Sequence, residues 1–513
     1  MWVVIMLLAL FLFSFFLPKK IDKSASAFGS AKFGKPSYTK RKHGLCINGK
    51  HRLSVQDSFR HLCLIAGSGG SGGAQGGKST TYVIPTIIRL AKEQKRKHQN
   101  SMIVLDLKGS LHSLLSGYLE SQGYAVHVLD FTNPSRSDLY NPLTRLRTEQ
   151  ETKDFAFELF DSSNQGKATE GIWRVGASMI LYWLLEILRH QGTPYNNLAN
   201  LMHLLYQVDD GTDTIQHLID QHITSGNIPQ QFKAFMQTDS KLRSSQLATA
   251  ISTLIEYDTQ EVKHLTKADT INFTLLRKRK TVLFLKTPVL SGSHTNLVTI
   301  FFRQLFHYLL STPVSKSDYP LYCLMDEFGN LGKIGRDNDF VQALTLLRSQ
   351  KVSLSLILQD ISQLHSVYGS HQAKAILSGC GHILAYPGIR GDSVTYISQQ
   401  LGTSTYAFEE QDKQKRIARP LQTNTEIREM TYGLCLPSST QASQFTLYPI
   451  FKQRCLMRQA KLTSKNGLTL ATLPPHLSQS NTHPLQLLQL ASEPEKEVLS
   501  FDERLAQLLK QNK

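Results

Sequence analysis

The feature that most constrains the fold is the stretch G-G-A-Q-G-G-K-S, from Gly72 to Ser79, which fits the P-loop pattern G-x-x-x-x-G-K-[ST]. In this pattern backbone N–H groups surround phosphates, the lysine contacts the outer phosphates, and the hydroxyl binds Mg²⁺. An apolar run, His61 to Gly67, precedes the motif, and a helical stretch that becomes basic, Thr80 to Lys97, follows it. The order strand, glycine loop, helix predicts a nucleotide site in an α/β fold.

The glycine run is longer than the motif needs. About four residues, Ser68 to Ser71, separate the apolar run from the motif, so we expect the loop to bulge before it surrounds a phosphate. The predicted nucleotide-binding residues are the motif and the hydroxyl residue that follows it: Gly72, Gly73, Ala74, Gln75, Gly76, Gly77, Lys78, Ser79 and Thr80. Lys78 is also predicted to act in catalysis, and ATP is the expected nucleotide.

Further apolar runs predict the other strands of a parallel sheet. They lie at Met102 to Leu105, Tyr124 to Phe131 and Thr281 to Pro288, and a short helical pattern separates the first two. Asp106 ends the first of these runs. In open α/β sheets that edge is where ligands bind, so we expect the functional side chains to gather there.

The run LYCLM, Leu321 to Met325, ends at two carboxylates to which we assign separate roles. Asp326, together with the hydroxyl of Ser79, is predicted to bind Mg²⁺, and Glu327 is predicted to polarise the attacking water. A solvated strand end is the alternative for an Asp-Glu pair. The P-loop upstream favours the catalytic assignment.

Three more polar residues are candidates for the hydrolysis reaction. Gln359 ends the apolar run of KVSLSLILQD and is predicted to contact the γ-phosphate or the catalytic water, with a helix cap as the alternative. Arg348 and Arg390 are both candidates for the arginine that a ring NTPase supplies across a subunit boundary. Either is equally well explained as a surface ion-pair arginine.

The segment between the two halves of the predicted sheet has a different character. Helical patterns dominate from 148 to 267, and GIWRVGASMILYWLLEILRH predicts a buried helix of about five turns. A transmembrane assignment fails for this helix, because only 11 uncharged residues separate Arg174 from Glu186. We therefore predict an all-helical domain at 148–267, inserted into a nucleotide-binding domain formed by 61–147 and 268–460.

The N-terminus carries the signal for a membrane. Residues 1–17 are uncharged and mainly apolar, at the lower edge of the length that spans a bilayer, and Pro18-Lys19-Lys20 ends the run. A cleavable signal peptide is the alternative, but no positive region precedes the apolar core. We predict one transmembrane helix within 1–18 and a basic juxtamembrane segment at 19–60, whose charge places the bulk of the chain in the cytoplasm. That segment is either a solvated tether or a surface for anionic headgroups.

Composition adds weaker constraints. The formal net charge of +17 favours a nucleic-acid partner, although about half of the excess lies in the juxtamembrane segment. The six cysteines form no C-x-x-C pair, which indicates a reducing compartment and no zinc site. Residues 461–513 are rich in Gln, Ser, Leu and Pro and are predicted to be a flexible tail with a small amphipathic helix near its end.

An ordered set of motifs resembles a known family. Along the chain they are GSAKFG, GGKST with YVIP, DLKGSL, YNPL, LMDEFGNLGKI, LRSQKVSLSLILQDISQL, ILSGCGHILAYPG and RPLQTNTEIREM. In order and spacing the set resembles the TraG-type coupling proteins of type IV secretion and conjugation systems, from about Gly29 to Arg458. The resemblance implies a membrane-anchored, RecA-like ATPase that uses ATP and Mg²⁺ and assembles as a hexameric ring at the bacterial inner membrane.

The resemblance also implies partners and site residues. Relaxase or relaxosome proteins would deliver single-stranded DNA, and the ring would pass it to components of the type IV secretion channel. The residues that would bind nucleotide, form the Walker B pair and sense hydrolysis are Gly72, Gly77, Lys78, Ser79, Thr80, Asp326, Glu327 and Gln359.

The chain departs from the family in three places. It shows one short apolar segment where the family has two membrane helices, its loop before the P-loop is longer, and D-L-K-G-S replaces the family's D-P-K-G-E. Two other functions stay open. One is a secretion receptor for protein cargo whose nucleotide site controls docking; the other is a chromosome-partitioning pump, which the helical insert disfavours.

Overall fold

The computed structural model describes residues 26–36, 38, 41–67, 77–93, 95–107, 109–163, 171–208, 213–223, 226–287, 292–336, 338–410, 413–449 and 485–488. The predicted transmembrane helix at 1–18 and the motif residues Gly72 to Gly76 lie outside the described residues. Of the predicted 461–513 tail, the described part is 485–488.

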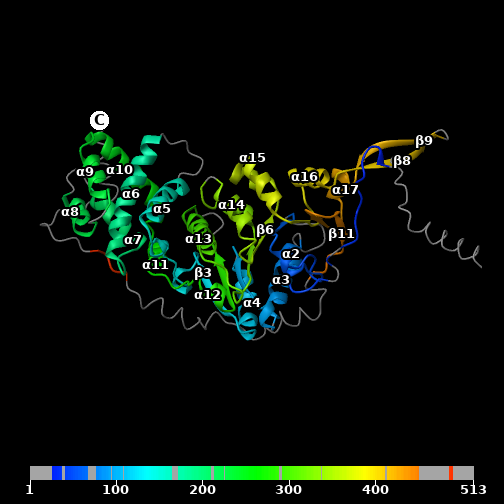
Figure 1. The fold of residues 1–513 in the computed structure, drawn as a ribbon, viewed down its shortest axis with the longest axis horizontal. Helices are drawn as coiled ribbons and strands as arrows, with labels where there is room; N and C mark the ends of the chain where they lie inside the picture. Colours follow the sequence, from blue (N-terminus) through cyan, green and yellow to red (C-terminus); the bar gives the residue numbers. More distant parts are fainter. Residues whose placement is uncertain are drawn as a thin grey trace, which may run out of the picture.

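A nine-stranded sheet forms the centre of the α/β part (Figure 1). The strands of the chain are β1 (Leu62–Ile65), β2 (Ser101–Leu105), β3 (Ala125–Asp130), β4 (Thr281–Lys286), β5 (Leu321–Met325), β6 (Val352–Leu358), β7 (His382–Ala385), β8 (Thr403–Glu410), β9 (Lys413–Pro420), β10 (Gly433–Pro437) and β11 (Ser443–Phe445). The four runs predicted at 102–105, 124–131, 281–288 and 321–325 are all strands here.

The sheet has the order β11-β10-β7-β1-β6-β5-β2-β4-β3, and β1 to β7 pair in parallel. This confirms the predicted α/β fold with a largely parallel sheet. Two features were not predicted. β10 and β11 extend one edge in antiparallel fashion, and β8 pairs with β9 in a separate antiparallel hairpin.

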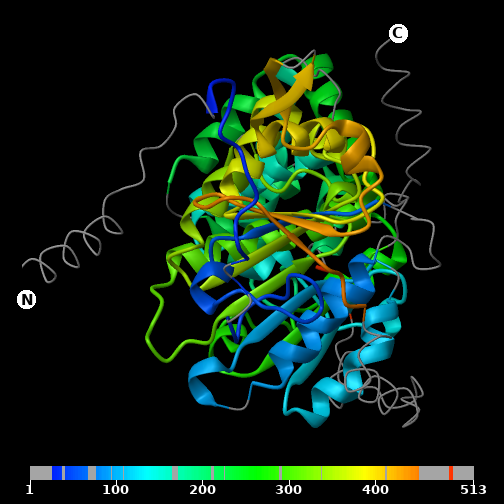
Figure 2. The same ribbon diagram turned by 90° about the vertical axis from the view of Figure 1, so that its right-hand side faces the viewer.

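The two faces of the sheet belong to two hydrophobic clusters, because successive side chains of a strand point to opposite faces. Leu62 and Leu64 lie in one cluster, with the helices that follow β1 and β2, whereas Cys63 and Ile65 lie in the other, which continues into the helical domain. Both faces of the sheet are therefore covered, as a continuous apolar strand such as LCLI requires. Figure 2 shows the helices on either side of the strands.

The helices divide between the α/β part and the insert. The α/β part carries α2 (Val55–Ser58), α3 (Ile84–Ala91), α4 (Ser110–Ser121), α12 (Leu275–Lys278), α13 (Gly292–Ser311), α14 (Asp339–Leu346), α15 (Ser362–Gly379), α16 (Asp392–Leu401) and α17 (Asn424–Arg428). The insert carries α5 (Glu149–Ser163), α6 (Gly171–Gln191), α7 (Leu198–Gln207), α8 (Asp213–His222), α9 (Ile228–Met236), α10 (Ser240–Leu254) and α11 (Gln260–Thr266). In Figure 1 the insert forms its own bundle at one end of the molecule.

The helix α6 matches the buried five-turn helix expected from the sequence. Among the described residues, it is the one helix long and apolar enough to cross a membrane by length and composition, and 67% of that stretch is buried inside the molecule. Glu186 lies within it at 1% exposure and pairs with Arg189 one turn later. Burial in the helical bundle explains its apolar character.

Part of the predicted 19–60 juxtamembrane segment packs onto the sheet. Leu45, Ile47 and Leu53 are buried in the same cluster as Leu62 and Leu64. These apolar residues stand between basic ones, which is why composition suggested a tether. This stretch contributes to the core of the α/β part.

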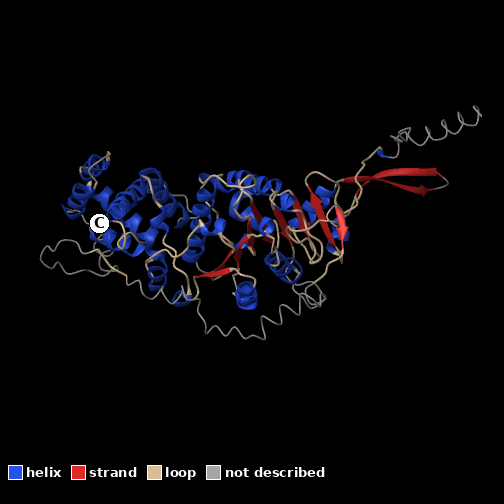
Figure 3. Cartoon of the chain, turned by 60° about the horizontal axis from the view of Figure 1, so that its bottom comes forward, coloured by secondary structure: helices blue, strands red, loops and turns tan. Residues whose placement is uncertain are grey.

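The β8–β9 hairpin projects from the body of the molecule (Figure 3). The chain near the N-terminal end of the described part lies at its base, where Ala31 N donates to Thr403 O at 3.1 Å and Thr405 N donates to Gly29 O at 3.1 Å. The first described residues are thereby fixed against a segment nearly 380 positions later.

Ion pairs join the helix α5 of the insert to the α/β part. Arg303 on α13 contacts the carboxylates of Glu158 on α5 and Asp339 on α14, and Arg336 Nη2 lies 3.0 Å from Asp154 Oδ1 on α5. Glu158 is 4% exposed, so its charge depends on Arg303 for compensation. We call Asp154, Glu158, Arg303, Arg336 and Asp339 the junction cluster.

Candidate nucleotide site

The predicted site residues come from three neighbouring strands. Lys78 follows β1, Gln359 follows β6, and Asp326 and Glu327 follow β5. Because β6 lies between β1 and β5 and all three are parallel, their carboxyl ends meet at one edge of the sheet. The structure thus brings together residues that lie about 250 positions apart in the sequence.

The chain re-enters the described region at a tight turn just before Lys78. Gly77 has a left-handed backbone (φ 68°), which glycine adopts without steric cost, and its carbonyl accepts a hydrogen bond from Thr81 N at 2.7 Å. The next six residues, Lys78–Val83, form a π-helical turn that leads into α3. Such wide turns occur often at functional sites.

Lys78 contacts both predicted Walker B carboxylates. Its Nζ atom lies 2.7 Å from Glu327 Oε1 and 3.9 Å from Asp326 Oδ1, and the lysine is 8% exposed. An ammonium this buried needs opposite charge beside it, and here the two carboxylates supply it. The lysine and the two carboxylates form one electrostatic unit.

The other oxygen of Glu327 is held by two amides. Gln359 Nε2 and Asn330 Nδ2 each donate to Glu327 Oε2 at 2.8 Å. Gln363 contacts both of these residues. Its Oε1 accepts from the backbone N of Gln359 at 3.0 Å, and its Nε2 donates to Asn330 Oδ1 at 3.2 Å. The orientation of the Glu327 carboxylate is therefore set from two sides.

Glu327 has a left-handed backbone, with φ 56° and ψ 37°. This conformation costs a residue with a side chain roughly 1 kcal/mol or more, and such strain concentrates at functional sites. It turns the chain directly after β5, so the side chains of Asp326 and Glu327 reach the same space. Continuation of the strand would place them on opposite faces.

Burial changes the acidity of the carboxylates at this edge. Burial raises the pKa of Asp326 to about 6, Lys78 lowers it, and Glu327 raises it. Burial also raises the pKa of Asp106 at the end of β2, although the N–H of His112 donates to its carboxylate at 2.8 Å. Clustered acids of this kind favour the arrival of a cation, which stabilises their charged forms.

The residues present fit a magnesium-bound nucleotide. Thr80 Oγ1 is buried and has no hydrogen-bond partner among the described residues, so this hydroxyl is available to a ligand. Oxygen ligands from carboxylates and hydroxyls are what Mg²⁺ prefers. Asp326 and the hydroxyls of Ser79 and Thr80 are the groups here that would hold it.

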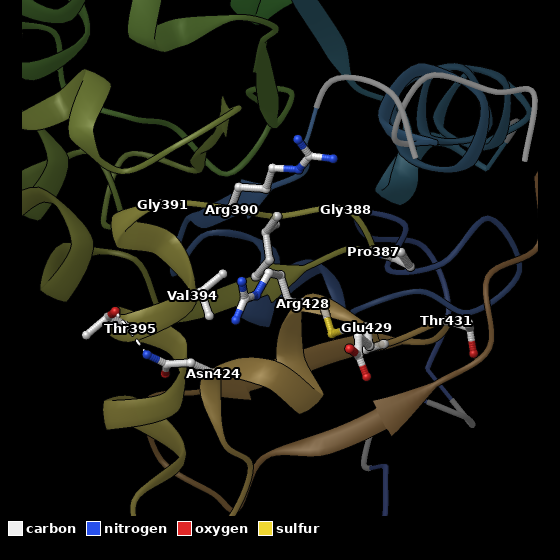
Figure 4. A pocket seen from close by; sticks show the side chains of 12 residues that line it. Pro387, Gly388, Arg390, Gly391, Val394, Thr395, Asn424, Arg428, Glu429 and Thr431 are labelled. Atoms are coloured by element: carbon white, nitrogen blue, oxygen red, sulfur yellow. Dashed lines mark hydrogen bonds between the residues drawn. The ribbon is translucent and has the colours of Figure 1, made fainter. Parts of the chain in front are cut away.

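A cavity of about 950 Å³ opens on the β7 side of β1, between the loop after β7 and the segment at the end of α17. Figure 4 shows Arg390 on the loop after β7, with Arg428 and Glu429 on the facing segment at the end of α17. Gly67, where the glycine-rich segment begins, lies so close to Gly388 O that an added Cβ would be 1.9 Å from it. The start of the predicted phosphate loop therefore lies directly against the cavity wall.

The two candidate arginines are placed differently. Arg390 lines the cavity at the edge of the sheet where the other site residues gather. Arg348 lies just before β6, at the opposite edge, and donates to the backbone carbonyl of Gly379. The role of Arg348 across a subunit boundary stays a prediction.

Sequence reasoning missed several residues of this site. Asn330 and Gln363 were not singled out, although each lies close along the chain to an assigned residue. Asp360, which directly follows Gln359, was not singled out either, but its carboxylate accepts a hydrogen bond from Ser393 Oγ at 2.8 Å, next to the cavity. Side chains that orient a reactive group carry no motif of their own, since their role depends on strand order.

With this geometry in view, the similarity to known proteins can be judged. The family model described as "Type IV secretory system Conjugative DNA transfer" matches residues 20–438. The chain belongs to this family. Its predicted resemblance to TraG-type coupling proteins is confirmed by that match.

Curated relatives of the conjugative DNA transfer family match at lower coverage. Protein VirD4 of Rhizobium rhizogenes is 25% identical over 380 residues, 71% of this chain and 53% of the relative. Protein VirD4 of Agrobacterium fabrum is 24% identical over 380 residues, again 71% of this chain and 53% of the relative. The chain spans about half the length of the curated relatives it matches.

Solved structures support the fold. The bacterial conjugative coupling protein TrwBdeltaN70 with sulphate superimposes with a TM-score of 0.61 at 17% identity, covering 82% of this chain and 96% of that one. The plasmid coupling protein TrwB in complex with ADP and Mg²⁺ gives the same values. At this identity the likeness shows the fold of the conjugative DNA transfer family, a RecA-like P-loop fold.

Proposed function

We propose that this protein is an ATP-driven coupling ATPase that moves single-stranded DNA toward a type IV secretion channel. The observation that carries the proposal is the unit formed by Lys78, Glu327 and Gln359 at one edge of the sheet, in a chain of the conjugative DNA transfer family. A lysine for phosphates, a carboxylate for water and an amide beside it are the parts that hydrolysis requires. TrwB, which shares the fold, binds ADP and Mg²⁺.

The chain's own residues suggest how hydrolysis is switched on. Lys78 and Glu327 neutralise each other at 2.7 Å. Phosphates compete for Lys78, and Glu327 then keeps its orientation through the amides of Gln359 and Asn330. The Glu327 carboxylate then accepts a proton from water. When Mg²⁺ is bound by Asp326, Ser79 and Thr80, it supplies charge stabilisation to the phosphates.

The cavity beside the P-loop suits the nucleoside half of the substrate. It lies on the β7 side of β1, whereas the catalytic residues lie on the β6 and β5 side, so a nucleotide bound at the P-loop has its phosphates at one end and the cavity at the other. Asp360 connects the two ends, because it follows Gln359 and its carboxylate bonds Ser393. Arg390 serves either the bound nucleotide or a neighbouring subunit of a ring.

The wider role follows from the family. We propose a homo-hexamer, anchored in the bacterial inner membrane by the predicted helix in 1–18, that receives DNA from relaxase or relaxosome proteins. A cargo pump must accept any sequence, so its DNA contacts are expected to be phosphate-dominated and weakened by salt. The net charge of +17 agrees with such a partner.

The test is the ATPase rate of the purified full-length chain with and without single-stranded DNA. We expect DNA to raise the rate several-fold at low salt, and Lys78→Ala and Glu327→Gln to remove both the basal and the stimulated rate. Hydrolysis that is indifferent to DNA in assembled rings would contradict the DNA pump and favour protein cargo. Hydrolysis that survives both substitutions would contradict the site itself.

A further inference from the structure

The four described residues of the predicted tail lie on the helical insert. Leu485 to Leu488 lie beside α7, at the end of the molecule opposite β11 (Figure 1). The match to the conjugative DNA transfer family ends at residue 438. The segment therefore lies beyond the part of the chain that the family accounts for.

Asn200 on α7 binds this segment through its backbone. Its Nδ2 donates to Gln486 O at 2.9 Å, and its Oδ1 accepts from Leu488 N at 2.7 Å. These two groups belong to residues i and i+2 of the segment, which is the pair that a neighbouring β-strand would bind. The Asn200 side chain thus makes the two hydrogen bonds that one residue of a neighbouring strand would make.

The orientation of Asn200 is fixed by the helix itself. Asn197 caps the start of α7, and its Oδ1 accepts from both the backbone N of Asn200 at 3.0 Å and Asn200 Nδ2 at 3.3 Å. Asn200 is 0% exposed and stands among the apolar residues of this helix. Without the segment, the Asn200 amide would lose two of its hydrogen-bond partners.

Two more contacts define the segment. The His203 ring, one turn after Asn200, hydrogen-bonds the backbone of Leu488. Leu488 is 7% exposed and belongs to the main hydrophobic cluster, whereas its neighbour Leu487 is 48% exposed. Leu488 is therefore the side chain of this segment that is buried against the insert. The site recognises an extended backbone and one leucine side chain.

We propose that the helical insert carries a peptide-binding site centred on Asn200 and that the chain's own residues 485–488 occupy it. The ligand class is an extended peptide with a leucine at the Leu488 position. Since the segment follows the α/β part but binds the insert, it links the two ends of the molecule. The proposal is independent of ATP hydrolysis and of the proposed DNA cargo.

The first test measures amide hydrogen exchange in the full-length chain. The Leu488 N–H donates to Asn200 Oδ1, so its exchange should be slowed at least about tenfold relative to an unstructured peptide. Asn200→Leu should remove the protection, and Leu487→Asp, which changes an exposed side chain, should retain it. A Leu488 amide that exchanges freely in the wild-type chain would overturn the proposal.

The second test adds a labelled peptide with the sequence of residues 481–492 to full-length variants. Leu488→Asp should vacate the site, so this variant should bind the peptide at least about tenfold more tightly than the wild type or Leu487→Asp does, since in those two the tail competes. Adding Asn200→Leu to Leu488→Asp should abolish the gain. If the peptide does not bind to Leu488→Asp, the proposed site is wrong. If the exchange protection of the Leu488 amide falls on dilution, the segment binds a second copy of the chain, and its assignment to the same chain is wrong.

Discussion

The nucleotide edge and the junction cluster both bury charged side chains, but they are built for different ends. At the nucleotide edge Lys78 lies between two carboxylates, one of which has a strained backbone, and Thr80 Oγ1 has no partner among the described residues. At the junction Arg303 contacts Glu158 and Asp339, and no residue of the junction cluster has a left-handed backbone. The difference teaches that a strained backbone beside buried charges, more than the charges themselves, marks a binding site.

The comparison predicts opposite results for substitutions in the two regions. At the nucleotide edge, Glu327→Gln should lower the ATP hydrolysis rate by about 10³-fold, because the amide cannot accept the proton of water. Its unfolding free energy should fall by less than that of Arg303→Ala, since Gln is isosteric and Asp326 remains beside Lys78. Steady-state hydrolysis and urea unfolding measure the two quantities. If Glu327→Gln lowered the unfolding free energy as much as Arg303→Ala does, the two regions would not differ in the way proposed.

At the junction, Arg303→Ala should lower the unfolding free energy by about 3–5 kcal/mol, since it leaves Glu158 buried without its partner. Burial raises the pKa of Glu158 to about 7 even with Arg303 beside it. Without that arginine the folded state binds a proton that the unfolded state lacks above pH 4.5, so stability should rise as pH falls from 8 to 5. The double variant Arg303→Met with Glu158→Leu is the control and should recover most of the loss.

The pKa of Asp326 gives a further test of the comparison, because nucleotide binding should depend on the protonation of the carboxylate that ligates Mg²⁺. With a pKa of about 6, Asp326 is largely ionised at pH 7 and largely protonated at pH 5. A magnesium-bound ATP analogue should therefore bind about tenfold more weakly at pH 5 than at pH 7. Asp326→Asn should bind the analogue weakly at both pH 5 and pH 7. Protonation of the nucleotide itself affects the wild type and the variant equally. Equal pH dependence in the two would exclude Asp326 as the ligand.

The smallest effect is expected at the rim of the junction. Arg336 and Asp154 are partly exposed, at 28% and 38% of their side chains, so water already screens their charges. Asp154→Asn should change the unfolding free energy by less than about 1 kcal/mol. A loss as large as that of Arg303→Ala, measured under the same conditions, would show that the junction acts as one network.

Much of the sheet and its site could be predicted because parallel strands carry two signals at once. A buried strand is a continuous apolar run, and its polar carboxyl end marks the functional edge, which is how Asp326, Glu327 and Gln359 could be assigned. Their mutual contacts depended on strand order, which the sequence does not state. Whether these residues catalyse hydrolysis stays a prediction.

Other features lacked a local signal. The β8–β9 hairpin mixes polar and charged residues on both strands, so it shows no apolar run. The docked segment 485–488 is too short for periodicity, and Asn200 is one polar residue within an apolar helix. In each case the partner that explains the residues is distant in the chain.

The central position of β1 has a consequence for how the chain is made. Its four residues are fully buried between β6 and β7, yet it leaves the ribosome before either. Roughly 290 residues separate the end of β1 from the start of β6. At 5–20 residues per second, this apolar strand waits roughly 15–60 s for its first neighbour. The helical insert can form from local contacts during that time. Synthesis therefore favours completion of the insert before β6 and β7 pair with β1 in the central sheet.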